Sequence, residues 1–512
     1  MTDENLYSLL SARFPQDRAG RRFAKLEDGR HYSYADVEGV TARFAQALVG
    51  MGVEPGDRVA AQVEKSIEAF LLYLATVRAG GVFLPLNTAY TPAEIAYFLT
   101  DAEPRVFVCS PERAAGLAQI AENAGARLET MGVWGADKSA DEIGSFFAAI
   151  PEEADFQTVE RTADDLATIL YTSGTTGRSK GAMTTHGNLY SNAVTLCDFW
   201  GFTDQDVLVH ALPIFHTHGL FTSSNTILAA GAQMIWQNRF NADQVIAALS
   251  EATTMMGVPT FYTRLLDHDG FTRDLTAHMR LFVPGSAPML VETHERFQER
   301  TGQTVLERYG MTETQMNTSN PYKGPRRPGT VGPPLPDIDV RITDPETGRS
   351  VPTGDVGMIE VRGPNVFKGY WRMPEKTAEE LRENGFFITG DLGRIDEDGY
   401  VSIVGRSKDL IISGGYNVYP KEIEEAIDDL DGVQESAVVG VPHPDFGEGV
   451  IAVVVQEPGA DLSEDAILSG LSDLARFKQP KHVFFADELP RNTMGKVQKN
   501  VLRDQHGAVF SG

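Results

Sequence analysis

Two long stretches of the chain alternate short β-rich runs with helical segments, and this rhythm limits the folds open to it. The first stretch, residues 32–165, has β-rich runs at 59–63, 82–84 and 106–108 and a helical segment at 66–79. The second stretch, which begins at residue 166, has such runs at 207–209, 233–236, 255–258 and 281–283. Strands that alternate with helices form parallel sheets covered by helices. The sequence therefore predicts an α/β protein with two helix-covered sheets.

The rest of the chain has a different composition. Between residues 326 and 405, turn dipeptides such as Asp344-Pro345 and Thr347-Gly348 separate short strands, which is typical of a β-rich subdomain. After residue 405 a compact α+β pattern follows. A chain of 512 residues exceeds the size at which one hydrophobic core stops growing. We predict a large N-terminal domain, a small C-terminal domain and a boundary near residues 406–409. The predicted domains are 1–405, with subdomains at about 1–165, 166–325 and 326–405, and 406–512.

Composition excludes several classes of protein. The formal net charge of −26 argues against general nucleic-acid binding. No apolar run approaches the ~18 residues of a membrane span, and the acidic start at residues 1–5 is unlike a signal peptide. Cys109 and Cys197 have no metal-site or redox spacing and are expected to be core thiols. We therefore expect a cytoplasmic protein, with no membrane or nucleic-acid partner, that binds any anionic substrate through a local positive site.

The sequence YTSGTTGRSKG at residues 171–181 directly follows an apolar run. Glycines let the backbone approach an anion, and hydroxyls, backbone N–H groups and Lys180 can surround phosphate oxygens. The spacing differs from that of Walker NTPases, because Lys180 follows Gly177 by three residues and is followed by Gly181. The segment indicates a phosphate loop of another kind; a flexible polar turn is the alternative.

Four further motifs follow in order: YGMTE at 309–313, TGDL at 389–392, GRSKD at 405–409 and PRNTMGK at 490–496. With the phosphate loop, they make nearly the whole chain resemble the adenylate-forming superfamily of acyl-CoA synthetases, luciferases and peptide-synthetase adenylation domains. This resemblance implies a ligase that activates a carboxylic acid as an acyl-adenylate and transfers the acyl group to coenzyme A. ATP and CoA would be co-substrates, Mg²⁺ the cofactor, and the small domain mobile.

The resemblance also implies a nucleotide site. Tyr309 would stack on adenine, Asp391 would accept hydrogen bonds from the ribose hydroxyls, and Arg406 would add a further contact. The residues expected to bind ATP or AMP are Thr172, Ser173, Gly174, Thr175, Thr176, Gly177, Lys180, Ser286, Tyr309, Asp391 and Arg406.

Three residues are expected to be catalytic. Thr312 would bind the α-phosphate, and Glu313, with Thr172, would hold Mg²⁺, a hard cation that prefers oxygen ligands. Lys496 would stabilise the transition state, because attack of a carboxylate on the α-phosphate brings two anions together. Acetylation would remove the charge of Lys496, so a lysine acetyltransferase and a deacetylase are possible partners.

In the resembling family the small domain rotates before thioester formation. The hinge corresponds to Lys408, and Ser413, Gly414 and Gly415 would let the pantetheine arm of CoA pass close to the backbone.

The segments HALPIFHTHG at 210–219 and VPTFYTRLL at 258–266 resemble malonyl-CoA synthetases. This favours malonate, methylmalonate or another small 2-substituted malonate as substrate. Such an acid keeps one carboxylate charged, and burying that charge unpaired costs several kcal/mol. Arg264 is the predicted partner, although it could instead face solvent. Ser286 and His210 would assist, and Met311 would limit the 2-position, although it could instead fill a gap in the core.

Alternatives remain for both the site and the function. His216 and His218 have an i, i+2 spacing, but no Cys or carboxylate stands nearby to complete a zinc site, so they are expected to shape the acyl entrance. The acid could be an uncharged short-chain or aryl acid. The chain could instead load a carrier-protein thiol, act as a luciferase-like oxidative enzyme, or only bind its ligands. Residues 137–160 match no motif.

Overall fold

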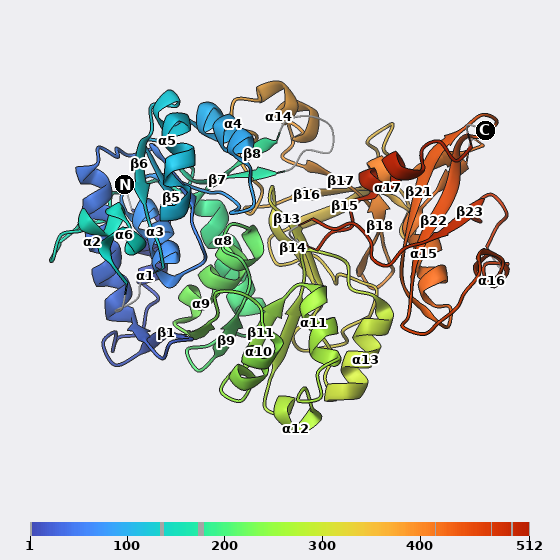
Figure 1. The fold of residues 1–512 in the computed structure, drawn as a ribbon, viewed down its shortest axis with the longest axis horizontal. Helices are drawn as coiled ribbons and strands as arrows, with labels where there is room; N and C mark the ends of the chain where they lie inside the picture. The colour runs from blue at the N-terminus through green and yellow to red at the C-terminus, as the bar shows by residue number, and fades with distance from the viewer. Residues whose placement is uncertain are drawn as a thin grey trace.

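The computed structural model describes residues 3–133, 138–172, 179–414, 416–472, 474–492 and 495–510. Figure 1 shows a large N-terminal body, and beside it a smaller C-terminal body that carries β21, β22, β23, α15 and α16. The chain is thus a mixed α/β protein with several sheets, which confirms the predicted fold class. No described helix is long and apolar enough to cross a membrane.

The first six-stranded sheet has the order β6-β5-β3-β4-β7-β8, and its strands are parallel except for the antiparallel pair β7 and β8. The strands are β3 (Arg58–Gln62), β4 (Val82–Pro85), β5 (Val106–Cys109), β6 (Arg127–Thr130), β7 (Leu166–Thr172) and β8 (Lys180–Thr185). The helices between them are α3 (Ile67–Arg78), α4 (Pro92–Ala102), α5 (Ala114–Asn123), α6 (Ala140–Ile143) and α7 (Ser145–Ala148). The strands predicted at 59–63, 82–84 and 106–108 correspond to β3, β4 and β5.

The second six-stranded sheet has the order β12-β11-β9-β10-β1-β2. Its strands are β1 (Arg22–Leu26), β2 (His31–Ser33), β9 (Val207–His210), β10 (Gln233–Trp236), β11 (Thr254–Gly257) and β12 (Leu281–Pro284). The helices connected to it are α1 (Leu6–Ser11), α2 (Tyr34–Gly50), α8 (His186–Phe199), α9 (Ser224–Ala230), α10 (Ala242–Leu249), α11 (Pro259–Leu266), α12 (Arg273–Thr276) and α13 (Val291–Thr301).

The sheets do not follow the predicted subdomain boundary near residue 165. Strand β1 pairs in parallel with β10, whereas β7 and β8 complete the first sheet. Four strands, β1, β2, β7 and β8, therefore lie in the other sheet from the one that a boundary at residue 165 predicts, because β1 and β7 have parallel partners that are remote in sequence.

Helix α3 is buried between the two sheets, which explains why it is apolar on all sides. Its Phe70 packs against Trp236 of β10, with ring centroids 5.9 Å apart. Its Tyr73 packs against Phe83 of β4, at 5.5 Å. Cys109 and Cys197 are buried free thiols, as predicted.

The remaining strands form three smaller sheets. A two-stranded sheet contains β13 (Arg308–Met311) and β14 (Gln315–Ser319), and a four-stranded antiparallel sheet contains β15 (Asp339–Thr343), β16 (Gly357–Arg362), β17 (Phe387–Ile395) and β18 (Val401–Arg406), with α14 (Pro374–Glu380) between β16 and β17. The C-terminal sheet contains β19 (Ile411–Ser413), β20 (Tyr416–Val418), β21 (Val433–His443), β22 (Gly447–Gln456) and β23 (His482–Phe485), with α15 (Pro420–Asp428), α16 (Glu464–Gly470) and α17 (Lys499–His506).

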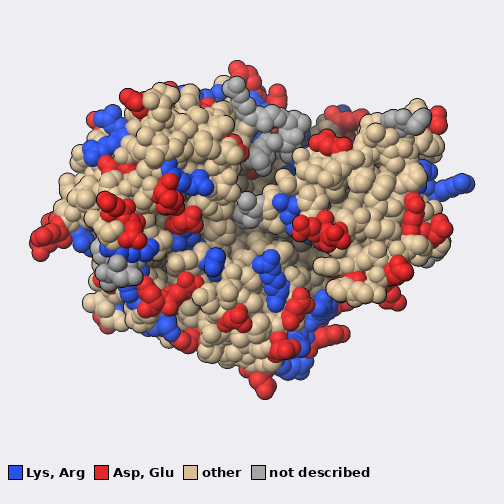
Figure 2. Space-filling view, in the orientation of Figure 1, with Lys and Arg blue, Asp and Glu red and all other residues tan. Residues whose placement is uncertain are grey.

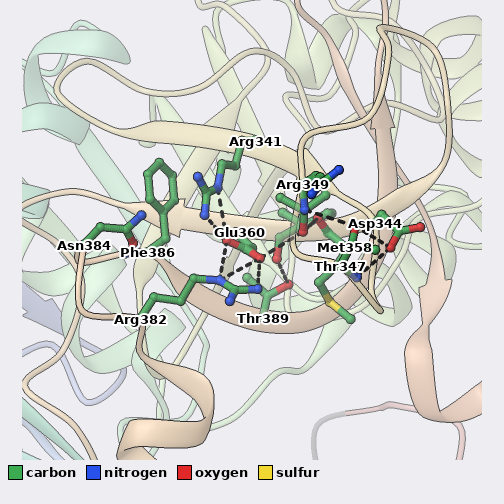
Figure 3. A network of polar contacts seen from close by, with 12 residues as sticks. Arg341, Asp344, Thr347, Arg349, Met358, Glu360, Arg382, Asn384, Phe386 and Thr389 are labelled. Atoms are coloured by element: carbon green, nitrogen blue, oxygen red, sulfur yellow. Dashed lines mark hydrogen bonds and ion pairs between the residues drawn. The ribbon is translucent and has the colours of Figure 1, made fainter.

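A buried ion cluster stabilises the four-stranded sheet. The Glu360 carboxylate on β16 is 0% exposed and lies between Arg341 and Arg382, whose nearest nitrogens are each 2.7 Å from it (Figure 3). Thr343 donates a further hydrogen bond of 2.9 Å. Burial raises the pKa of Glu360, but these hydrogen bonds outweigh it and hold the pKa below its ordinary value.

We expect Glu360→Gln to lower the free energy of unfolding by about 2–3 kcal/mol, because it leaves two guanidinium groups without their anion. Urea denaturation followed by tryptophan fluorescence measures this loss. The stabilisation from the ionised carboxylate is present above the unfolded pKa of about 4.3 and is lost as the pH falls through the lower folded pKa. Glu346→Gln, at an exposed position of the same subdomain, is the control; equal effects of the two substitutions would contradict the prediction.

Candidate active site

The motif residues come together near the C-terminal ends of the parallel strands, where α/β proteins bind ligands. Lys180 begins β8, Ser286 follows β12, and Tyr309 lies on β13. Figure 2 shows that the surface is hollowed where the two bodies meet, and that acidic and basic side chains are mixed over the described residues of this face.

Asp391 is the centre of a buried polar group. It is 4% exposed, its Oδ1 lies 2.7 Å from Arg406 Nε, and its Oδ2 accepts a hydrogen bond from the Tyr309 hydroxyl. Asp391 is the main cause of a raised pKa at Arg406, and burial followed by Asp391 raises the pKa of Tyr309. The structure therefore brings together three residues predicted to bind nucleotide.

Glu313 lies in a second polar group. Its buried carboxylate accepts a hydrogen bond of 3.1 Å from the Tyr370 hydroxyl, and burial raises its pKa. Thr312, half-buried, precedes it. Thr172 ends β7 opposite Lys180, and its hydroxyl donates a 3.4 Å hydrogen bond to the Lys180 carbonyl. The described residues contain no cluster of three or more His, Cys, Asp or Glu side chains that could hold a metal alone.

Part of the predicted site cannot be placed. Ser173, Gly174, Thr175, Thr176 and Gly177 lie outside the described residues, and so does Gly415. Thr172 and Lys180, which stand on either side of residues 173–177, pair with each other across β7 and β8.

Lys496 extends from the C-terminal body toward these groups. Its backbone N–H donates a 3.0 Å hydrogen bond to the Asn492 side chain, and a Cβ atom at the adjacent Gly495 would lie 3.9 Å from Thr260 of α11. Lys496 keeps an exposed surface, yet enough protein surrounds its ammonium group that burial, followed by Arg406, lowers its pKa. The nearby carboxylates Asp391 and Glu313 oppose that shift.

The predicted hinge and the predicted CoA contacts lie next to each other along the chain. Lys408 keeps an exposed surface in a single 3₁₀ turn, Ser407–Asp409, and partial burial of its ammonium group lowers its pKa. The neighbouring Asp409 accepts a 2.6 Å hydrogen bond from Arg503 of α17. Ser413 is buried on β19, and Gly414 has a positive φ of 59°.

Two residues predicted for the acyl pocket, Arg264 and His210, differ in exposure and in their partners. Arg264 is exposed and makes no hydrogen bond or ion pair with any described residue, since the core-facing side of α11 carries Tyr262, Leu265 and Leu266. His210 is fully buried, and both its ring nitrogens have protein partners: Lys65 Nζ at 3.0 Å and the Gly219 carbonyl at 2.9 Å. Arg264 thus lies on the exposed side of α11 and the ring nitrogens of His210 are already occupied, and the predicted roles of both at a substrate carboxylate stay predictions.

Arg308 is a cation that the sequence analysis missed. It is 7% exposed, and its Nε and Nη2 atoms are buried without a hydrogen-bond partner among the described residues. Burial lowers its pKa to about 10, so it remains charged at neutral pH. A Cβ atom at Gly285 would overlap the guanidinium carbon, so a larger residue there would displace the Arg308 side chain.

The surroundings of Arg308 are polar, and among the described residues no carboxylate forms an ion pair with it. Ser286, held in the left-handed region with φ of 71°, lies 3.1 Å from His218 Nδ1. Burial and then Arg308 lower the pKa of His218, while burial, Lys496 and Arg308 lower that of His216 to about 3, so both are neutral. A buried cation beside neutral hydrogen-bonding groups suits an anionic ligand.

An apolar cavity of about 230 Å³ lies beside the C-terminal ends of β3 and β4. Its walls include Phe83, Ile214, Phe215, Phe240 and Phe261. Part of the 210–219 segment, predicted to line the acyl entrance, therefore lines a cavity. Met311 packs against the apolar cluster of Ala182, Phe367, Tyr370 and Phe387, and its predicted role at the 2-position stays a prediction.

The fold and the converging motifs define an enzyme that forms adenylates, and the chain belongs to the AMP-binding enzyme family. Residues 11–371 match the AMP-binding enzyme family and residues 422–496 match the AMP-binding enzyme C-terminal domain.

Individual members of the family that are similar to this chain include proteins of solved structure, a CoA ligase and a CoA synthase. A crystal structure of ATP-bound MatB from Rhodopseudomonas palustris is 57% identical, covers 99% of this chain and 100% of that chain, and superposes with a TM-score of 0.96. The apo form of MatB, also 57% identical over the same shares, gives 0.86. A malonate–CoA ligase of Arabidopsis thaliana is 33% identical over 94% of this chain and 86% of its own length. A feruloyl-CoA synthase of an Amycolatopsis species is 36% identical over 94% and 95%.

Proposed function

We propose that this protein is an ATP-dependent malonate–CoA ligase, which also accepts small 2-substituted malonates such as methylmalonate. The observation that carries the proposal is the buried guanidinium of Arg308, which lies beside Ser286 and His218 and whose Nε and Nη2 atoms have no hydrogen-bond partner among the described residues. After one carboxylate of malonate is activated, the other stays charged, and Arg308 can hold it with two parallel hydrogen bonds. The resemblance to a malonate–CoA ligase supports the same substrate.

The reaction has two steps. A carboxylate oxygen of malonate attacks the α-phosphorus of ATP, the bond to the bridging oxygen of the β-phosphate breaks, and pyrophosphate leaves. The sulfur of CoA then attacks the acyl carbon, AMP leaves, and the thiol proton passes to solvent. In the first step Lys496 stabilises the negative charge that accumulates between the two reacting anions. Its position near Asp391 and Glu313 supports this role.

The other residues bind and orient the nucleotide. We propose that Tyr309 stacks on adenine, that Asp391 and Arg406 hold the ribose end, and that Lys180 and the 173–177 loop bind the outer phosphates. Thr312 then contacts the α-phosphate. Glu313 and Thr172 would hold Mg²⁺, which neutralises phosphate charge when bound. One carboxylate fits this ion, because Mg²⁺ takes most of its ligands from substrate phosphates and water.

We propose that the second step follows a rotation of residues 406–512 about Lys408, which removes Lys496 and brings Ser413, Gly414 and Gly415 to CoA. The higher TM-score against ATP-bound than apo MatB supports an adenylating arrangement here. Because its side chain is exposed, Lys496 is open to acetylation, which would stop adenylation. We place the reaction in the cytoplasm, where ATP and CoA are supplied.

An aryl acid is the second candidate substrate, favoured by the likeness to a feruloyl-CoA synthase. A neutral aryl group would leave Arg308 buried and unpaired, so this reading is the weaker one. Loading of a carrier-protein thiol, luciferase-like oxidation and ligand binding without catalysis have no comparable observation in their favour.

A substrate panel tests the proposal. We expect AMP and acyl-CoA to form from malonate with kcat/KM at least about 100-fold above that for acetate, butyrate or benzoate, since a site built to pair a charge rejects substrates that lack it. Methylmalonate should follow malonate. AMP and thioester are quantified chromatographically, with ATP or CoA omitted as controls. If kcat/KM is highest for benzoate or acetate, the protein is still an acid–CoA ligase, but the proposal that its substrate is a dicarboxylate is wrong.

A further inference from the structure

Lys180 is paired with a carboxylate from a segment that no motif covers. Its Nζ lies 3.2 Å from both oxygens of Glu380, and the pair is largely sheltered, with exposures of 17% and 23%. The same ammonium group lies 4.1 Å from the Tyr370 ring centroid. The Tyr370 hydroxyl reaches Glu380 at 2.6 Å and Glu313 at 3.1 Å.

The position of Glu380 is fixed on both sides. It ends α14, whose Thr377 hydroxyl oxygen accepts a 2.9 Å hydrogen bond from the Tyr370 backbone N–H. Two residues later, Arg382 is held by the buried Glu360 (Figure 3). The backbone of Tyr370 forms an antiparallel bridge with Ala182, two residues after Lys180. Glu380 is therefore held beside β8 by the fold and is not a surface charge that meets Lys180 by chance.

We infer that Glu380 is an internal competitor for Lys180, which weakens the hold on the outer phosphates of ATP and speeds the release of pyrophosphate. This inference rests on the proposed function, in which Lys180 binds those phosphates. An incoming phosphate has to displace Glu380 from the ammonium group. When pyrophosphate leaves, the carboxylate restores the pair, so Lys180 is never left sheltered and unpaired.

Glu380 can give up Lys180 because it keeps two other partners. Lys376 Nζ lies 2.9 Å from its Oε1, and the Tyr370 hydroxyl donates to its Oε2. The Tyr370 hydroxyl has one proton for two carboxylates. When Glu313 no longer accepts a hydrogen bond from Tyr370, the Tyr370 hydroxyl can donate its proton to Glu380 alone.

Calorimetric titration of the full-length protein with Mg²⁺-pyrophosphate, Mg²⁺-ATP and AMP tests the inference. We expect Glu380→Gln to bind pyrophosphate and ATP about tenfold more tightly, equivalent to about 1.4 kcal/mol, and AMP unchanged, because AMP lacks the outer phosphates. In turnover, pyrophosphate should inhibit this variant at correspondingly lower concentrations. Glu379→Gln is the matched control, since Glu379 is one residue away, 65% exposed, and pairs only with Lys376 among the described residues.

A Lys180→Met background separates the possible failures. If Glu380 acts through Lys180, Glu380→Gln does not tighten pyrophosphate binding when Lys180→Met is also present. An effect of Glu380→Gln that comes from a general change of structure would be the same with and without Lys180→Met. Unchanged or weaker pyrophosphate binding by a Glu380→Gln variant with wild-type thermal unfolding overturns the inference alone, provided that Lys180→Met weakens ATP binding. If Lys180→Met leaves ATP binding intact, the phosphate-binding role of Lys180 in the proposed function fails as well. If Glu380→Gln does not fold, Glu380→Ala replaces it: tighter pyrophosphate binding supports the inference, and unchanged or weaker binding overturns it.

Discussion

Lys496→Met is expected to reduce malonate-dependent pyrophosphate release by about 10²–10³-fold, because it removes a fixed charge that acts on the transition state. The effect should fall on kcat more than on KM, since the cation is needed most when the two anions react. Pyrophosphate release measured with a coupled assay gives both constants. Lys499→Met is the control, because Lys499 lies three residues away and is paired with Glu424 at 2.5 Å.

The second half-reaction shows whether the loss is specific to adenylation. With malonyl-AMP and CoA supplied directly, Lys496→Met should form malonyl-CoA at close to the wild-type rate. An equal loss in both half-reactions would contradict the proposed rotation about Lys408.

The pH profile offers an independent check on Lys496. The protonated form is the active one, and its pKa is lowered by burial and by Arg406. The rate of adenylation should therefore fall on the alkaline side, and this fall should begin at a lower pH than for an ordinary lysine of pKa about 10.4. Any activity that Lys496→Arg retains should lack this alkaline decline, because a guanidinium stays charged throughout.

Local sequence patterns predicted the positions of the strands well but predicted poorly which strands pair with each other. The apolar runs at 207–209, 233–236, 255–258 and 281–283 became β9, β10, β11 and β12 almost residue for residue. The pairing of β1 with β10 joins residues about 210 positions apart in register, and no periodicity specifies such a partner. The motif residues Tyr309, Asp391 and Arg406 were found in one place, because the resemblance already contained the fold that unites them.

The candidate acyl pocket shows what sequence reasoning could and could not place. The helical phase of α11 was available: Tyr262, Leu265 and Leu266 mark the core side, and this phase turns Arg264 outward. The role of His210 was not available, because its partner Lys65 is 145 residues away. Arg308 directly precedes the 309–313 motif, but its significance lies in the lack of a hydrogen-bond partner among the described residues, which only a three-dimensional structure reveals.

The same lack of a partner makes Arg308→Met the sharpest test of the substrate. We expect kcat/KM for malonate to fall by about 10²–10³-fold, since a charge-paired contact of roughly 3–4 kcal/mol is lost. Activity toward acetate or butyrate should stay level or rise, because their acyl groups are neutral. Arg264→Met, which removes an exposed arginine, is the matched control and should leave both activities unchanged.

Stability should change in the opposite direction to activity. Replacing a buried, unpaired guanidinium with an apolar side chain of similar length relieves desolvation, so the Tm of Arg308→Met should exceed that of the wild type. Malonate alone should raise the wild-type Tm by binding the folded state and should not raise that of the variant. Thermal unfolding with and without malonate measures both effects. If Arg308→Met instead loses activity toward malonate and acetate equally and has a lower Tm, Arg308 supports the fold and does not bind the second carboxylate.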